Sequence, residues 1–140
     1  MNFLLDTNVV SEWAKPSPDA GVIRWLVEQD EDRVFLSVIT LAELRRGVER
    51  MGLGARRSRL EQWLEDEMTE RFAGRILGID ERIANQWGRF LALSEGRGKR
   101  MNLMDGFLAA TAGVMGLTLV TRNTKDFEVS GCSLLSPWQA

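Results

Sequence analysis

Phe3-Leu4-Leu5-Asp6-Thr7-Asn8 is the stretch of sequence that decides the fold. Its three apolar residues predict a short buried strand. An acid at the end of such a strand, followed by two small polar residues, places a carboxylate at the edge of a sheet. We therefore expect Asp6 to be the first of several acids gathered at one edge of a parallel sheet.

Length and composition indicate one globular domain spanning residues 1–140. The chain is 44% hydrophobic and 27% charged, which is ordinary for a soluble protein. Its formal net charge of −2 excludes nucleic-acid binding by overall charge, so any RNA or DNA contact requires a local basic patch. No apolar run approaches the roughly 20 residues of a membrane span, and the N-terminus lacks the cationic region of a signal peptide.

The cysteine and histidine counts exclude several kinds of site. The single cysteine rules out an internal disulfide, in agreement with a cytoplasmic location. The chain contains no histidine. This excludes a Ser-His-Asp or Cys-His catalytic device, a histidine-liganded zinc site and a two-histidine, metal-independent ribonuclease.

Hydrophobic periodicity predicts strands that alternate with helices. The expected strands are 2–6, 34–38, 75–79, 117–121 and a weak one at 133–135. A short helix is expected after the first strand, capped by Asn8. A Thr-x-x-Glu capping box is expected to open another helix at Thr40, which ends near Met51. The other expected helices are 19–29, 55–72, 80–94 and 103–115. Residues 122–127 are expected to be a loop or a single turn. The pattern predicts an α/β fold, a three-layer α/β/α sandwich with a mainly parallel sheet.

Five polar side chains are expected at the carboxyl edge of this sheet. Asp6 ends the first strand, Glu43 and Asp105 lie in the first turns of helices that begin at that edge, and Asn123 and Asp126 follow the fourth strand. Ligand sites of parallel sheets lie outside this edge. If strands one, two and four are neighbours, the side chains converge.

Three carboxylates within a few ångströms of one another require a compensating cation. Mg²⁺ and Mn²⁺ prefer such oxygen ligands. A bound ion of this kind activates water and stabilises charge on a phosphoryl oxygen. In a chain without histidine, this is the expected route to phosphodiester hydrolysis.

Each acid also has a purely structural interpretation. Asp6 fits an Asx turn, Glu43 a capping box, and Asp105 a favourable acid in a first helical turn. Asp126 is interpreted as a turn residue. The functional interpretation is preferred because independent caps have no reason to occupy one edge.

Four segments together resemble a PIN domain, and more narrowly a VapC-type toxin ribonuclease of the FitB-like group. They are Leu4 to Asn8, Ser37 to Gly47, Leu103 to Thr111, and Leu119 to Phe127. The resemblance implies a PIN fold, Mg²⁺- or Mn²⁺-dependent endoribonuclease activity, the toxin role in a type II toxin–antitoxin system, a cognate antitoxin and a homodimer.

The resemblance also assigns site residues. Asp6, Glu43 and Asp105 match the three family acids and are the expected catalytic residues and metal ligands. The fourth family position, often Asp, is Asn123 here. Its amide can donate an oxygen or position a water, but its neutrality argues against a strong second metal site, and Asp126 remains an alternative.

Candidate RNA contacts lie near these acids. Thr7, Asn8, Arg46 and Thr121 are the candidate substrate-binding residues. The arginine-rich stretch 45–59 has two equally weighted interpretations, an RNA-backbone track or a solvated helix face. Loop 97–100, with Arg97, Lys99 and Arg100, either contacts phosphate or is a plain flexible loop, and the second is preferred.

Two other functions stay open from sequence. A catalytically silent PIN-fold module would bind metal, RNA or a protein without cleavage. An aspartyl-phosphate phosphatase would need a second Asp two residues after its nucleophile, but position 8 is Asn.

Overall fold

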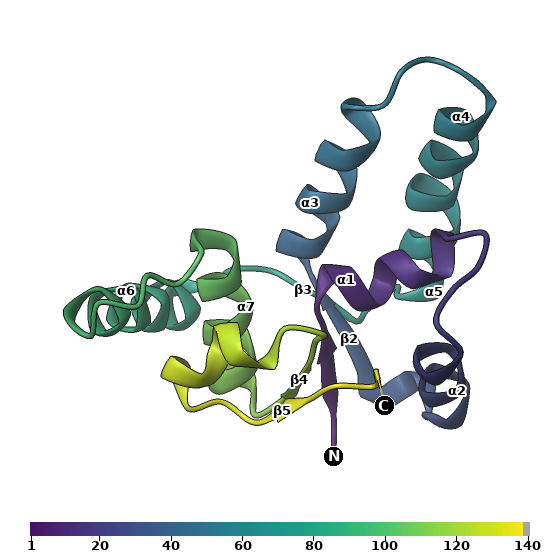
Figure 1. The fold of residues 1–140 in the computed structure, drawn as a ribbon. Helices are drawn as coiled ribbons and strands as arrows, with labels where there is room; N and C mark the ends of the chain where they lie inside the picture. The colour runs from purple at the N-terminus through teal and green to yellow at the C-terminus, as the bar shows by residue number, and fades with distance from the viewer. Residues whose placement is uncertain (139–140) are drawn as a thin grey trace.

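Five short parallel strands form the centre of the molecule (Figure 1). The computed structural model describes residues 1–138, so the last two residues of the expected domain lie outside the described residues. The strands are β1 (Phe3–Leu5), β2 (Val34–Ser37), β3 (Ile76–Leu77), β4 (Thr118–Val120) and β5 (Leu134–Leu135), in the order β3-β2-β1-β4-β5. Every neighbouring pair is parallel, which confirms the expected sheet.

Helices cover both faces of this sheet (Figure 1). One face carries α6 (Glu81–Gly96), α7 (Leu103–Met115) and the 3-10 segment η4 (Thr124–Ser130). The other face carries α1 (Thr7–Val10), η1 (Ser11–Ala14), α2 (Ala20–Glu28), η3 (Trp63–Met68) and α5 (Thr69–Arg71). A short 3-10 turn, η2 (Glu31–Arg33), leads into β2. The three-layer α/β/α prediction is confirmed.

The strand period of two divides the core between these faces. In β1, Leu4 packs with Leu108 of α7 on one face, and its neighbours Phe3 and Leu5 pack with the other helical layer. Both sides of the central strands are therefore buried, and all three residues of β1 are at most 7% exposed.

Strand order places the ends of β1, β2 and β4 side by side. Phe3 is in register with Val34 on one side, and Leu5 with Val120 on the other. The chain builds β2 and β3 outward from β1 and then crosses back to place β4 on the opposite flank. The carboxyl ends of β1 and β4 thus form the topological switch point, where open parallel sheets bind ligands.

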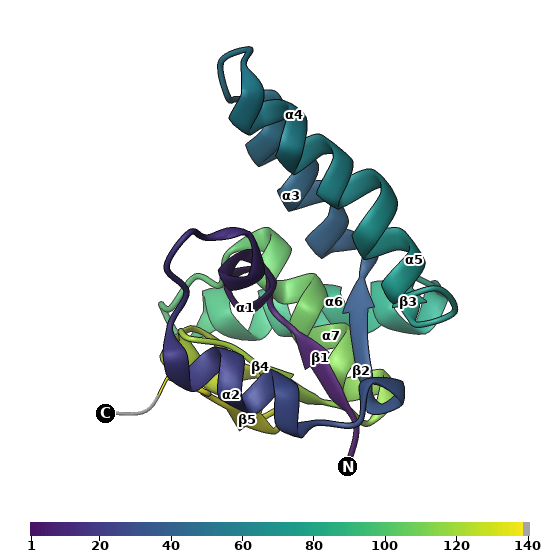
Figure 2. The ribbon, with the colours of Figure 1, turned by 90° about the vertical axis from the view of Figure 1, so that its right-hand side faces the viewer.

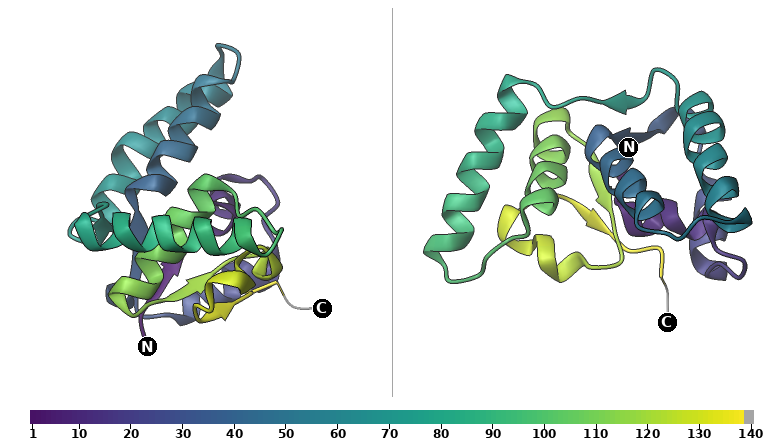
Figure 3. Two further views of the ribbon diagram at one scale, coloured as in Figure 1. Left: turned by 90° about the vertical axis from the view of Figure 1, so that its left-hand side faces the viewer. Right: turned by 90° about the horizontal axis from the view of Figure 1, so that it is seen from above.

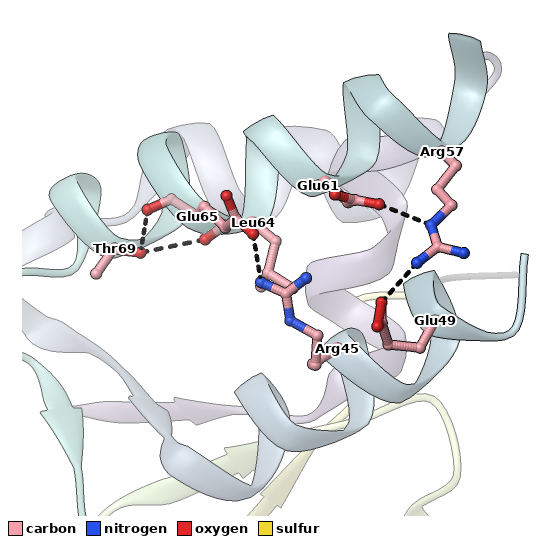
Figure 4. A network of polar contacts seen from close by, with 7 residues as sticks. All are labelled: Arg45, Glu49, Arg57, Glu61, Leu64, Glu65 and Thr69. Carbon is pink, nitrogen blue, oxygen red and sulfur yellow. Dashed lines mark hydrogen bonds and ion pairs between the residues drawn. The ribbon is translucent and has the colours of Figure 1, made fainter. Parts of the chain in front are cut away.

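The helical hairpin of α3 (Val38–Glu49) and α4 (Ala55–Gln62) projects from the carboxyl edge (Figures 2 and 3). The expected helix over 55–72 is present, but its middle is π-helical, since α4 passes into η3 and then into the short helix α5. The Thr69 hydroxyl donates to the Leu64 and Glu65 carbonyl oxygens at 3.1 and 2.8 Å. Both bonds tie the Thr69 side chain back to carbonyl groups of η3 (Figure 4).

Two expected helix starts were wrong. Asp6, not Asn8, caps α1, since its side chain accepts from the Thr7 backbone N–H. Helix α3 begins at Val38, where Ser37 Oγ accepts from the Ile39 N–H at 3.0 Å, so no capping box forms at Thr40. Glu43 consequently lies in the second turn of α3 rather than the first. The 3-10 segment η4 replaces the expected loop or single turn at 122–127.

Gly106 lets α7 pack closely against α6. A Cβ atom built there would lie 3.1 Å from side-chain atoms of both Trp87 and Leu91. The Trp87 indole N–H donates to the Leu103 carbonyl oxygen at 2.9 Å, and its ring stacks on Phe107 at 4.7 Å. The missing side chain of Gly106 therefore permits the close contact between α6 and α7.

No helix among residues 1–138 is both long and apolar enough to cross a membrane.

Substituting the two helical glycines of α7 tests this packing. Ala raises helix propensity by about 1 kcal/mol in either position. Gly113→Ala should stabilise the protein, because its added Cβ meets only Phe90, at 3.9 Å. Gly106→Ala should be less stable than Gly113→Ala by about 1–3 kcal/mol, because it overpacks the α6–α7 contact. Urea unfolding measures the difference, and equal stabilities would contradict the packing argument.

Candidate active site

Asp6 is buried at the carboxyl end of β1. Its backbone N–H donates to the Val120 carbonyl oxygen at 2.9 Å, which extends the pairing with β4 by one residue. Its Oδ1 accepts from the Thr7 N–H and its Oδ2 from the Thr121 hydroxyl, each at 2.7 Å. The residue is only 6% exposed. Both carboxylate oxygens are thus fixed by the ends of the two strands that form the switch point.

Burial raises the pKa of Asp6 above its ordinary value. The hydrogen bonds from Thr121 and Thr7 oppose that rise because they stabilise the charged form. The nearby negative charges of Glu43 and Asp126 raise the pKa further. Asp6 therefore lies close to other acids, as the sequence predicts.

Glu43 is joined to this strand end through Thr7. The Thr7 hydroxyl donates to Glu43 Oε1 at 2.7 Å and lies 3.5 Å from the Thr40 hydroxyl. Thr7, the residue directly after Asp6, therefore links α1 to α3. Glu43 is half-buried and reaches the cluster from the second turn of α3.

Asp105 comes to the same place from the first turn of α7. Asn102 caps this helix, accepting from the Met104 and Asp105 N–H groups at 2.9 and 3.3 Å. Burial raises the pKa of Asp105 to about 7, and the charges of Asp6, Glu43 and Asp126 add to the rise. The structure thus brings Asp6, Glu43 and Asp105 within electrostatic range of one another.

Asn123 and Asp126 are the two candidates for the fourth site position of the family. Asn123 is exposed, its backbone N–H donates to the Thr121 hydroxyl oxygen at 3.1 Å, and its side chain makes no capping bond to η4. Asp126, which we interpreted as a turn residue, has a charge that raises the pKa of both Asp6 and Asp105. Asp126 therefore contributes negative charge to the cluster, whereas sequence alone suggested only a turn residue.

Hydrogen bonds of Asn8 and Thr121 stabilise the segments around Asp6. Asn8 Oδ1 accepts from the Arg122 N–H at 3.3 Å, and its Nδ2 lies 3.5 Å from the Thr121 hydroxyl oxygen. Thr121 is fully buried and donates to Asp6. Of the candidate substrate-binding residues, Thr7, Asn8 and Thr121 thus have their polar atoms engaged with neighbouring groups.

The arginine-rich stretch is partly neutralised by ion pairs (Figure 4). Arg45 pairs with Glu65 at 2.8 Å, and Arg57 pairs with both Glu49 and Glu61 at 2.7 Å. Arg46, the fourth candidate contact, is exposed and makes no ion pair within residues 1–138. These pairs, which join α3 to η3, join α3 to α4 and lie within α4, favour the helix-face interpretation for two of the six arginines.

Oxygen donors of this type suit a divalent cation. The cluster offers only carboxylate, hydroxyl and amide oxygens, which are the ligands of Mg²⁺ and Mn²⁺. Among residues 1–138, no three Asp, Glu or Cys side chains stand so that they can hold one metal ion. The donor chemistry fits such an ion, and in this structure Glu43 is hydrogen-bonded to Thr7.

Comparison with known proteins gives consistent matches. The PIN domain family model matches residues 3–130. The VapC ribonuclease Y4jK of Sinorhizobium fredii is 38% identical over 136 residues, which are 97% of this chain and 97% of that protein. Toxin FitB of Neisseria gonorrhoeae is 39% identical over 135 residues, 96% of this chain and 97% of that protein. The structure of FitAB bound to the IR36 DNA fragment matches with a TM-score of 0.92 at 36% identity, covering 99% of this chain and 96% of the matched chain.

Stability against pH tests the environment of Asp105. Its folded-state pKa of about 7 lies above the ordinary 3.8, so the folded protein holds a proton that the unfolded chain releases. Without divalent cations, stability should therefore fall as pH rises from about 4 to about 7, by an amount on the order of 1 kcal/mol after solvent screening. Asp6, whose pKa is also raised, adds to the same trend.

Asp105→Asn should flatten this profile because the amide does not titrate. Urea unfolding at pH 5 and pH 8, with chelator present, measures the effect. Asp80→Asn is the matched control, since Asp80 is an exposed cap of α6 whose pKa is lowered, chiefly by its backbone hydrogen bond with Ile83. An Asp105→Asn profile as steep as that of the natural chain would contradict the assignment.

Proposed function

The chain belongs to the PIN domain family, and from this premise we propose that it is the ribonuclease toxin of a toxin–antitoxin pair. It cleaves RNA with a water molecule activated among Asp6, Glu43 and Asp105. The observation that carries the proposal is the raised pKa of Asp105, to which the charges of the other two acids contribute. The relative named VapC ribonuclease supports the ribonuclease activity, and the relative named toxin FitB supports the toxin role.

We infer that Mg²⁺ or Mn²⁺ is the cofactor and that Asp6, Glu43 and Asp105 hold it. Ionising the buried carboxylates together costs free energy, and a divalent cation offsets that cost. When bound, the ion supplies an activated water and stabilises charge on the phosphoryl oxygen. The exclusively oxygen-donating side chains of the cluster support this choice of metal.

The side chains of the chain have separate roles in this proposal. Thr121 and the Thr7 N–H keep the two oxygens of Asp6 in fixed directions. The Thr7 hydroxyl holds Glu43 beside the strand end until the acids come together. Burial and the neighbouring acids raise the pKa of Asp105 to about 7, and a bound cation would favour its ionised form. Asn123, at the rim, is placed to position a water or a phosphate oxygen.

The partners belong to the same proposal. We infer a cognate antitoxin, because the matched relative is named a toxin and the matched structure is FitAB bound to DNA. A homodimer and a cytoplasmic location follow from the family resemblance.

Asp6→Asn tests the proposal most simply. The amide oxygen can still accept the Thr7 N–H bond, so the fold should survive while RNA cleavage falls by about 100-fold or more through loss of the central negative charge. Cleavage of total RNA is measured with added Mg²⁺ or Mn²⁺ and again with chelator, which should stop it. Asp80→Asn, a cap away from the cluster, should cleave normally.

Unchanged cleavage by Asp6→Asn would contradict the role of this residue. Calorimetric metal binding by the natural chain, with no cleavage of varied RNAs, would instead favour a catalytically silent binding module.

The fourth position is tested by comparing Asn123→Ala with Asp126→Asn. Asp126 contributes charge at both Asp6 and Asp105, so its neutralisation should weaken Mn²⁺ binding and cleavage by about 10-fold, as loss of an outer partner of a metal site does. Asn123→Ala should alter metal affinity less, because it removes no charge. Calorimetric titration with Mn²⁺ measures both, and the reverse order would contradict the role given to Asp126.

A further inference from the structure

A cavity beside the acid cluster is lined by four cationic side chains. It has a volume of about 530 Å³ and lies between the loop joining α6 to α7, the start of α7, and η4. The loop runs directly into α7, and η4, which follows β4, lies against both (Figure 3). The cations are Arg97, Lys99, Arg100 and Lys125, and the acids in the same wall are Asp105, Asp126 and Glu128.

The charges of these four cations are not neutralised within the protein. All four side chains are exposed, and none forms an ion pair with a carboxylate among residues 1–138. In the α3–α4 hairpin, Arg45 and Arg57 are paired with glutamates (Figure 4), while Arg50, Arg56 and Arg59 are exposed and make no ion pair among the described residues. Asp105 therefore shares a cavity wall with four cations that make no ion pair among the described residues.

Backbone hydrogen bonds hold this wall beside Asp105. The Lys99 N–H donates to the Ser94 carbonyl oxygen at 2.9 Å, and the Met101 N–H to the buried Ser94 hydroxyl oxygen at 3.3 Å. Asn102 then caps α7, which carries Asp105 in its first turn. The loop that we expected to be plain and flexible is thus tied to both helices.

We propose that this cavity binds the RNA phosphates next to the one that is cleaved, so that the strand crosses loop 97–100 and Lys125 rather than the α3–α4 hairpin. The inference rests on the proposed ribonuclease function and names the binding track of that site. Lysine and arginine side chains bind nucleic-acid backbones by neutralising phosphates and releasing counterions. The volume falls in the range of ligand pockets, about 300–1,000 Å³, and so has room for a nucleotide unit.

The cations of the cavity wall also offset the repulsion between RNA and the acids of the site. When ionised, Asp6, Glu43, Asp105 and Asp126 repel a polyanion, and one bound divalent cation compensates only half of their combined charge. Cations within the same cavity attract the flanking phosphates and leave the acids free to act on one phosphodiester. Sequence alone favours the arginine-rich stretch over this loop, because the ion pairs of that stretch are visible only in the structure.

Two matched triple variants test the proposal. One is Arg97→Gln with Lys99→Gln and Arg100→Gln. The control is Arg50→Gln with Arg56→Gln and Arg59→Gln, which removes the same charge from three exposed hairpin arginines without ion pairs among the described residues. Both are made in an Asp6→Asn background, so that fluorescent single-stranded RNA is bound and not cut. Anisotropy with added Mg²⁺ gives Kd at several salt concentrations.

The loop variant should weaken RNA binding by about 10-fold or more and lower the slope of log K against log salt by about 2, the value for three lost single-strand phosphate contacts. Lys125→Gln alone should lower the slope by about 0.7. The hairpin variant should bind within about 2-fold of the parent. A loop variant with unchanged Kd, or a hairpin variant that loses as much, would overturn the proposal.

An RNA cleavage assay tests this inference separately from the ribonuclease function on which it rests. With the natural Asp6 restored, the loop variant should raise KM and leave kcat nearly unchanged, because it removes binding and not the acids. Absence of cleavage by the natural chain would count against the ribonuclease proposal, and the binding arm would still decide the cavity. Melting temperatures check that every variant is folded, with Lys99→Gln alone as the mildest substitution.

Discussion

Mutual repulsion among carboxylates that the sheet topology forces together is the constraint on which the rest of the structure depends. The neighbours of β1 are β2 and β4, so residues that follow these strands meet at one edge. Asp6 ends β1, Glu43 belongs to the helix after β2, and Asp126 follows β4. Burial raises the pKa values of both Asp6 and Asp105. The charges of Glu43 and Asp126 add to the rise at Asp6, and those of Asp6, Glu43 and Asp126 add to it at Asp105.

Hydroxyl groups keep this unfavourable arrangement in place. Thr121 holds one oxygen of Asp6, and Thr7 binds Glu43 while its N–H holds the other oxygen of Asp6. These bonds stabilise the ionised carboxylates but do not remove the cost of burying them. The protein thus gives up some stability at the site, and a divalent cation would restore it. Such a conflict between stability and function is expected where a site is built in advance of its ligand.

Much of this arrangement was predictable from sequence because parallel α/β folds obey strong rules. A buried strand followed by Asp6, and alternation of strands with helices, sufficed to place the acids on one edge. Local capping was harder to predict, since Ser37 and Thr40 both offered a hydroxyl. The structure uses Ser37, and Thr40 is buried in the helix that follows. The proximity of Asp126 to Asp105, the pairing of Arg57 and the cation-lined cavity depend on tertiary contacts, which spacing along the chain does not encode.

Anomalous diffraction from a crystal of the natural chain grown with Mn²⁺ tests the central claim most directly. The account predicts a single strong manganese peak among the carboxylate oxygens of Asp6, Glu43 and Asp105, with Glu43 turned away from the Thr7 hydroxyl. A crystal that contains Mn²⁺ but shows no peak at this edge, or shows one bound by a different set of residues, would contradict it.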